Sequence, residues 1–189
     1  RSVSLSSDGN IVAIGSQDND GNGSKSGHVR IYENISGSWS QIGNDIDGEA
    51  ADDNSGYSIS LSGDGNTVAI GAYGNDENGT SSGHVRIYEN IGGSWSQIGI
   101  DIDGEDQNDY SGYAVSLSSD GNTVVIGSPS APSWGSDSGY VRIYQNVGGS
   151  WSQIGNDIVG EADDDHCGYS VSISSDGHAV AIGAPDYGA

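Results

Sequence analysis

The sequence lacks most of the residues on which common functional sites depend. It contains no methionine, no phenylalanine, one cysteine (Cys167) and 5 basic residues against 27 acidic ones. A single cysteine excludes an intrachain disulfide, and no apolar run approaches the roughly 18 residues that indicate a membrane-spanning helix. The formal net charge of -22 repels nucleic-acid phosphates and anionic lipids, so we expect neither nucleic acid nor membrane insertion for this chain.

The abundant residues favour strands and turns. The 189 residues include 32 glycines, and serine, asparagine and aspartate are frequent, all of which supply tight turns. The apolar residues are mainly valine, isoleucine, tyrosine and tryptophan, which favour strands over helices. Because these apolar residues recur periodically, the high charge does not indicate a disordered chain.

An internal repeat of 56 residues runs through the chain without an insertion or deletion. Four sets of positions show it most clearly: Leu5, Leu61, Leu117 and Ile173; Asp8, Asp64, Asp120 and Asp176; Arg30, Arg86 and Arg142; Trp39, Trp95 and Trp151. The sequence therefore predicts three full units at residues 1–56, 57–112 and 113–168, and a partial fourth unit at residues 169–189.

Each unit contains four short segments in which apolar and polar residues alternate. In the second unit these segments are residues 57–62, 67–72, 83–90 and 94–99, separated by turns or polar loops. Alternation with a period of two predicts strands, and four strands per unit of this length are typical of a β-propeller blade. We therefore predict an all-β protein of four-stranded antiparallel propeller blades, with a β-solenoid as the alternative.

The number of units does not match a complete ring. Propellers usually have about four to eight blades, and the chain starts at Arg1, inside the repeat pattern. We therefore expect a segment of a longer, ring-forming protein, although an open arc and the pairing of two chains remain alternatives.

Three short motifs resemble a known repeat family. A Gly-Tyr pair opens each unit after the first, Ile182-Gly183-Ala184-Pro185 ends a second strand, and Gly27-His28-Val29-Arg30-Ile31-Tyr32 begins a third strand. The chain resembles the FG-GAP repeat of integrin-α-type propellers over its whole length. The resemblance implies blades of an about seven-bladed ring and extracellular adhesion or scaffold work. The family's calcium loop is not carried over, because the connection between the first two strands is too short here.

The loop between the second and third strands of the first unit offers a different candidate for calcium. Asp18, Asp20 and Asn22 alternate around a bend at Gly21 and could supply oxygen ligands to this ion; a polar surface turn is the alternative. A second group of acids recurs between units, including Asp45, and these loops are expected on one rim of the ring. Either solvated loops or divalent cations would explain them.

The repeated arginines and tryptophans are predicted to be structural. Arg30, Arg86 and Arg142 lie within strands, and a strand charge that is buried needs an acidic partner from a neighbouring loop. Trp39, Trp95 and Trp151 recur in every full unit, which favours packing between blades over sugar binding. Trp134 breaks the repeat in a loop and is therefore the candidate for a specific ligand contact.

Further candidate sites are weaker. Asn22, Asn34 and Asn78 fit the N-glycosylation motif in predicted loops. The four histidines, His28, His84, His166 and His178, do not follow a metal-ligand spacing along the chain, and no nucleophile motif is present. We therefore predict that the protein is not an enzyme.

These observations favour a non-catalytic extracellular module for structure, adhesion or assembly. The alternative is a carbohydrate-binding, lectin-like module assisted by calcium, which is also the one cofactor that the sequence suggests. The expected partners are other protein or polysaccharide surfaces, or further repeats of the same chain.

Overall fold

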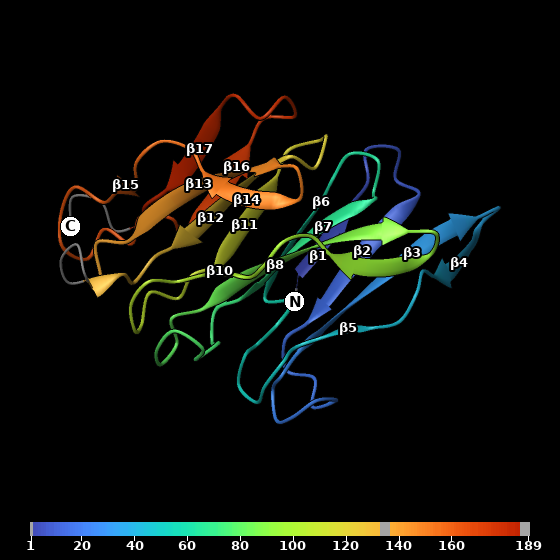
Figure 1. Ribbon diagram of the computed structural model, residues 1–189, viewed down its shortest axis with the longest axis horizontal. Coiled ribbons are helices and arrows are strands. Elements are labelled where there is room, and N and C mark those ends of the chain that lie inside the picture. Colours follow the sequence, from blue (N-terminus) through green and yellow to red (C-terminus); the bar gives the residue numbers. More distant parts are fainter. Residues whose placement is uncertain (1, 133–136, 186–189) are drawn as a thin grey trace.

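The computed structural model describes residues 2–132 and 137–185, and the elements of these residues are strands (Figure 1). No helix in this described part is long and apolar enough to cross a membrane. The strands form four separate antiparallel sheets, the last of which has two strands. The prediction of an all-β protein is therefore confirmed.

The sheets follow one another along the chain, and we call them blades 1 to 4. Blade 1 contains β1 (Ser2–Leu5), β2 (Ile11–Ser16), β3 (His28–Ile35), β4 (Ser38–Gln41) and β5 (Ile46–Asp47). Blade 2 contains β6 (Ser58–Leu61), β7 (Thr67–Ala72), β8 (His84–Ile91), β9 (Ser94–Gln97) and β10 (Ile102–Asp103). Blade 3 contains β11 (Ala114–Leu117), β12 (Thr123–Ser128), β13 (Tyr140–Val147), β14 (Ser150–Gln153) and β15 (Ile158–Val159). Blade 4 contains β16 (Ser170–Ile173) and β17 (Val180–Gly183).

The strand register repeats with the sequence. Leu5 pairs with Val12 in blade 1, and Leu61 pairs with Val68 in blade 2. Neighbouring strands within a blade are antiparallel and belong to the same unit, whereas a solenoid would stack the same strand of successive units into one continuous sheet. The architecture is thus a series of propeller blades, and the solenoid alternative is wrong.

The outer strand of each full blade is divided, which the sequence pattern did not predict. In blade 2, β9 pairs with the second half of β8, and β10 pairs with its first two residues. The predicted strand at residues 94–99 is therefore too long, and the following acidic loop contains a second short strand. A bulge separates the two short strands. The Ile98 amide donates to the Ile87 carbonyl at 2.8 Å, and the backbone then turns away from β8 at Gly99, which has a φ of 75°.

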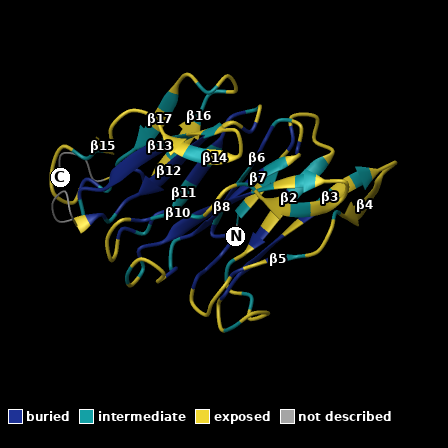
Figure 2. Cartoon of the chain, in the orientation of Figure 1, coloured by how far each residue is buried: buried dark blue, intermediate teal, exposed yellow. Residues whose placement is uncertain are grey.

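The core lies between the faces of successive blades. Val29 and Ile31 of blade 1 pack in one cluster with Leu61, Val68 and Ile70 of blade 2. A matching cluster joins blades 2 and 3. Figure 2 shows the buried residues along the strands and exposed residues mainly in the loops and in β4. Each sheet therefore covers one face of the next, as β-branched rows on both faces require.

Polar contacts repeat at these blade junctions. The amide of Leu61 donates to the Ser4 hydroxyl at 2.9 Å, and the amide of Leu117 donates to the Ser60 hydroxyl at 3.0 Å. These strands are the first of their blades, and the hydroxyl of one blade satisfies an amide of the next. The serines that alternate with leucine in the sequence are therefore structural.

The Gly-Tyr pair at each blade opening has a steric cause. A side chain at Gly15 would collide with the Gly56 carbonyl oxygen, and Gly56 has a φ of 81°, where other residues are strained. The following Tyr57 stacks on Tyr113 with ring centroids 4.8 Å apart, and Tyr113 stacks on Tyr169 at 5.1 Å. The motif therefore combines close backbone approach with a ladder of aromatic rings.

Candidate functional site

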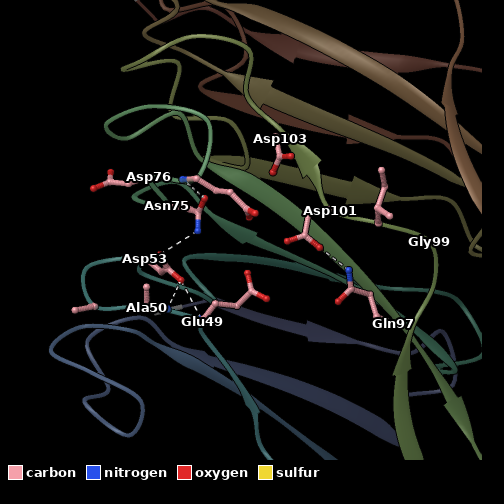
Figure 3. A pocket seen from close by; sticks show the side chains of 12 residues that line it. Glu49, Ala50, Asp53, Asn75, Asp76, Gln97, Gly99, Asp101 and Asp103 are labelled. Carbon is pink, nitrogen blue, oxygen red and sulfur yellow. Dashed lines mark hydrogen bonds between the residues drawn. The ribbon is translucent and has the colours of Figure 1, made fainter.

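Acidic side chains gather in a cleft between blades 1 and 2. They come from the segment after β5, from the β7–β8 loop and from the segment before β10, and they surround a cavity of about 920 Å³. Figure 3 shows this arrangement, with Glu49 and Asp53 on one side of the cleft and Asp101 and Asp103 on the other. The prediction that acidic loops gather on one rim holds for this pair of blades.

Asp53 holds the first side of the cleft in place. Its carboxylate accepts the amides of Glu49 at 2.9 Å and Ala50 at 2.8 Å, and it also accepts the Asn75 side-chain amide at 3.1 Å. Asp53 is itself buried. These bonds fix the position of Glu49 and link the segment after β5 to the β7–β8 loop.

His84, the first residue of β8, lies beside the cleft, next to the lining residues Glu49, Glu77 and Asp101. Its side chain is fully buried, and neither ring nitrogen makes a hydrogen bond. Nδ1 lies 3.5 Å from an Asp101 carboxylate oxygen. Burial lowers the pKa of His84 to about 4, with the Arg86 charge adding to this shift and Asp101 opposing it. The imidazole is therefore neutral near pH 7, so one ring nitrogen carries a proton and the other is available as a ligand.

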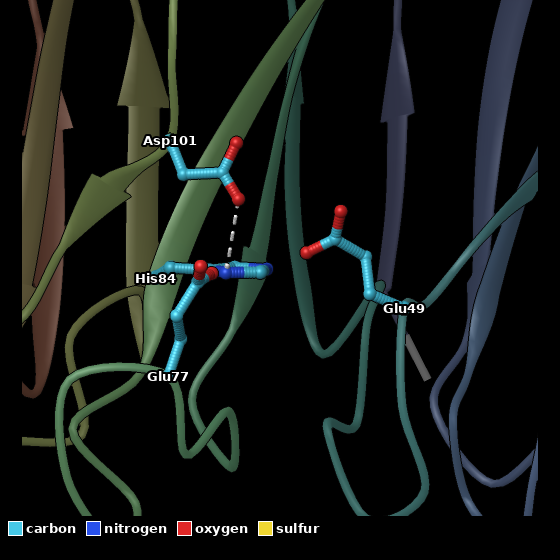
Figure 4. Close-up of side chains that lie close together, drawn as sticks. All are labelled: Glu49, Glu77, His84 and Asp101. Atoms are coloured by element: carbon cyan, nitrogen blue, oxygen red, sulfur yellow. Dashed lines mark ion pairs between the residues drawn. The ribbon is translucent and has the colours of Figure 1, made fainter.

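Four side chains of the cleft converge closely enough to share an ion. One ligand atom each from Glu49, Glu77, His84 and Asp101 lies within 4.8 Å of the others (Figure 4). A related group in blade 1 consists of His28, Asp45 and Asp47.

The carboxyl groups of the cleft repel one another. Burial raises the pKa of Glu49, and repulsion from Asp101, Glu77 and Asp53 raises it further. The attraction of the Arg86 guanidinium opposes this rise. The pKa of Asp103 is also raised, mainly by burial and further by Asp101 and Glu77. The cleft therefore favours positive charge.

Each repeated arginine contacts an acid of the loops between strands, as expected. Arg30 binds Asp45 within blade 1, with Nη2 2.8 Å from the carboxylate. Arg86 reaches back to blade 1, where Nη1 lies 3.3 Å from Glu49 and Nη2 donates to the Asp47 carbonyl at 2.7 Å.

Arg142 combines a contact within its own blade with a contact to the preceding blade. It binds Asp157 of its own blade and Glu105 of the preceding blade, each at 2.7 Å. Arg142 is buried, whereas Arg30 has an exposed side chain. The arginine thus joins a blade to the one before it where such a blade is present.

The tryptophans of the fourth strand also join blades. Trp95 Nε1 donates to the Ile42 carbonyl at 3.0 Å, and Trp151 Nε1 donates to the Ile98 carbonyl at 3.1 Å. Trp39, in the first blade, is 50% exposed. Packing between blades therefore accounts for Trp95 and Trp151, as predicted. Trp134, the predicted ligand contact, lies outside the described residues.

The predicted calcium loop uses its side chains to shape a turn. The Asp18 carboxylate accepts the Gln17 amide at 3.4 Å, and the Asp20 carboxylate accepts the backbone amide of Lys25 at 2.8 Å. Asn22 Nδ2 donates to the Gly48 carbonyl at 2.8 Å. The three groups thus have different hydrogen-bond partners, and calcium binding at this loop stays a prediction.

The three predicted glycosylation positions differ in their contacts. The side-chain nitrogens of Asn22 and Asn78 donate to the carbonyls of Gly48 and Gly104, at 2.8 and 2.7 Å. Attachment of a glycan would disturb these bonds. Asn34 uses its oxygen instead, which accepts the Gly37 amide at 2.7 Å, so of the three Asn34 is the most compatible with modification.

His84 is the cleft residue that sequence reasoning missed. The spacing of the histidines along the chain gives no sign of this group, because its ligands come from two blades. The available signal was a histidine at the start of a third strand, 35 residues after Glu49 in the preceding unit, and this signal becomes meaningful only when blade stacking is known.

Comparisons with known proteins support the repeat and the fold. Residues 46–88, from β5 to within β8, match the family model described as FG-GAP repeat. A crystal structure of a proposed 6-phosphogluconolactonase from Bacteroides uniformis ATCC 8492 is similar, with a TM-score of 0.57 and 14% sequence identity. The match covers 96% of this chain and 46% of that chain, so this chain spans about half its length. No curated protein matches the sequence. The chain is thus built of β-propeller blades, and its residues 46–88 match the FG-GAP repeat.

Proposed function

We propose that the chain is a non-catalytic extracellular module for assembly or adhesion, to whose ends further blades of the same type dock. The first face of blade 1 carries this proposal. Val3 and Leu5 are 66% and 58% exposed there, whereas their counterparts Ile59 and Leu61 are 7% and 6% exposed in blade 2. The same aliphatic row is thus covered at the junction of blades 1 and 2 and open on the first face of blade 1.

The polar contacts of the junctions are open at the ends as well. Arg30 and Trp39 are exposed in blade 1, whereas Arg86 contacts the preceding blade. At the other end Ser172 is exposed, although its counterpart Ser116 accepts the amide of Ile173 at 3.1 Å. The exposed groups of blade 4 therefore match those that the first face of blade 1 would contact, which favours another blade of the same type as the partner.

The FG-GAP resemblance and the repeated, highly acidic sequence support the proposed extracellular location and the adhesion or assembly role. Many similar units offer many weak contacts, which together give avid binding. The similarity to the 6-phosphogluconolactonase concerns the fold alone, because the two chains share 14% identity.

Sedimentation velocity at increasing protein concentration tests the docking of ends. We expect the mass to rise with concentration and Leu5→Asp, which places a charge on the open face, to abolish the increase. Ile91→Asp is the matched control, because Ile91 is 62% exposed at the tip of β8, away from the blade faces. A chain that remains monomeric at millimolar concentration would contradict the proposal.

A glycan array probed with and without a chelator tests the alternative. We expect no specific glycan to bind, because Trp95 and Trp151 are occupied by contacts between blades. Glycan binding that the chelator removes would favour the lectin-like function over assembly.

A further inference from the structure

We propose that Glu49, Glu77, His84 and Asp101 form a site for a transition-metal ion of the Zn²⁺ type at the junction of blades 1 and 2. This inference does not depend on the docking of ends. It rests on two independent features: the convergence of four ligand atoms within 4.8 Å and a fully buried imidazole without a hydrogen bond.

The imidazole is the more informative feature. A buried polar group normally has a hydrogen-bond partner, because leaving it without one costs about 1–3 kcal/mol. Both ring nitrogens of His84 lack such a partner, and the ring lies among the carboxylates of Asp101, Glu77 and Glu49 (Figure 4). A metal ion bound to the unprotonated ring nitrogen would give that nitrogen a partner and explain why a histidine is tolerated there.

The spacing of the ligands suits such an ion after a small adjustment. In a tetrahedral zinc site with bonds of about 2.0 Å, ligand atoms lie about 3.3 Å apart. Glu49 and Glu77 are exposed, so their side chains are free to close on the ion, whereas His84 is held by its burial at the start of β8. One fixed nitrogen, the half-buried carboxylate of Asp101, which accepts the Gln97 amide, and two adjustable carboxylates would therefore form the site.

The charge of the site also matches. Three of the four ligands are carboxylates, and Arg86, 3.3 Å from Glu49, offsets their negative charge only in part. A divalent cation would offset more of it. Calcium is a poor candidate, since it prefers oxygen ligands alone, whereas zinc accepts histidine together with carboxylates.

The equivalent junction between blades 2 and 3 provides an internal comparison. Tyr140 stands at the position of His84, and its hydroxyl donates to Asp109 at 3.0 Å. The acidic residue Asp103 of the first junction is likewise replaced here, by Val159. The residue that replaces the histidine thus has the hydrogen bond that the histidine lacks, which assigns the metal site to the first junction.

Titration of the metal-free chain with ZnCl₂, followed by calorimetry and by NMR of the histidine rings, tests the proposal. We expect one ion per chain, a rise in melting temperature, and a shift of the His84 ring signals but not of the other three histidines. His84→Gln should abolish binding. Because His84 is buried and its replacement could disturb folding, Glu77→Gln is the second variant, and it should weaken binding at least tenfold.

Two matched controls complete the experiment. Glu89→Gln makes the same change on the exposed part of β8, and His28→Gln changes the equivalent histidine of blade 1; both should leave the affinity unchanged. Zinc binding that survives Glu77→Gln without moving the His84 signals would overturn the proposal. So would a failure to bind zinc at 0.1 mM, or equal affinity for Ca²⁺.

Discussion

Removal of one buried leucine tests whether blade stacking supplies the stability of this protein. Leu61 is 6% exposed and belongs to the cluster between blades 1 and 2. Leu61→Ala leaves a cavity that a stacked sheet can close only in part, and such substitutions cost 2–5 kcal/mol. We expect about 3 kcal/mol, which for a chain of this size lowers the melting temperature by about 9 °C.

The repeat supplies controls with the same residue type and the same strand position. Leu5 is 58% exposed at the open face of blade 1, so Leu5→Ala should cost less than about 1 kcal/mol. Leu117, which is 7% exposed at the next junction, should behave like Leu61.

Urea unfolding followed by circular dichroism measures the three variants. An unchanged slope with a lower midpoint would identify a loss of native stability. A similar cost for Leu5→Ala and Leu61→Ala would refute the reasoning, because it would show that the covered and open faces contribute equally.

Three further substitutions test the polar contacts. Trp95→Phe should cost about 1 kcal/mol in urea unfolding, because the Ile42 carbonyl loses its donor, whereas Trp39→Phe should have no measurable effect. Arg86→Leu should cost about 2 kcal/mol by the same measurement, since it removes the buried guanidinium from its ion pair with Glu49, which is half exposed. An unchanged urea midpoint would show that this ion pair adds no stability. Asp120→Ala should cost about 1 kcal/mol at pH 7, a small effect because the carboxylate is exposed, and an equal cost at pH 2 and pH 7 would contradict its role. Hydrogen bonds from Ser118 and Asn122 lower the pKa of this carboxyl below its unfolded value, so its contribution is present above about pH 4 and is lost as the pH falls through the folded pKa.

The blade pattern could be predicted from the sequence because each long strand carries its own alternation. Residues 67–72 were predicted as a strand and form β7 with the same bounds. The two-residue strand β10 could not be predicted, because two residues carry no periodicity and its pairing depends on a bulge that begins near Gly99. Local pattern therefore predicts the inner strands better than the divided outer strand.

The candidate site was less accessible to sequence reasoning, because its parts are distant in the chain. The acidic loops were recognised as a group, and the arginines were expected to form ion pairs with them. The partner of Arg86, however, is Glu49 of the preceding blade, 37 residues earlier, although Arg30 binds Asp45 within its own blade. Arg142 binds acids of both blades, so the acid that the arginine contacts differs from blade to blade, and the residue pattern of a single unit cannot show this.

The choice made by Arg86 also determines what the first junction can bind. In blade 1, Arg30 occupies the Asp45 carboxylate with contacts as short as 2.8 Å, so the related group around His28 is largely neutralised. In blade 2 the arginine turns toward Glu49 and the Asp47 carbonyl, and the equivalent carboxylate, Asp101, accepts the Gln97 amide and faces His84. The same backbone thus presents an acid bound by arginine in blade 1 and an acid facing a buried histidine in blade 2, so the proposed cation site depends on both the histidine and an arginine that is directed away from Asp101.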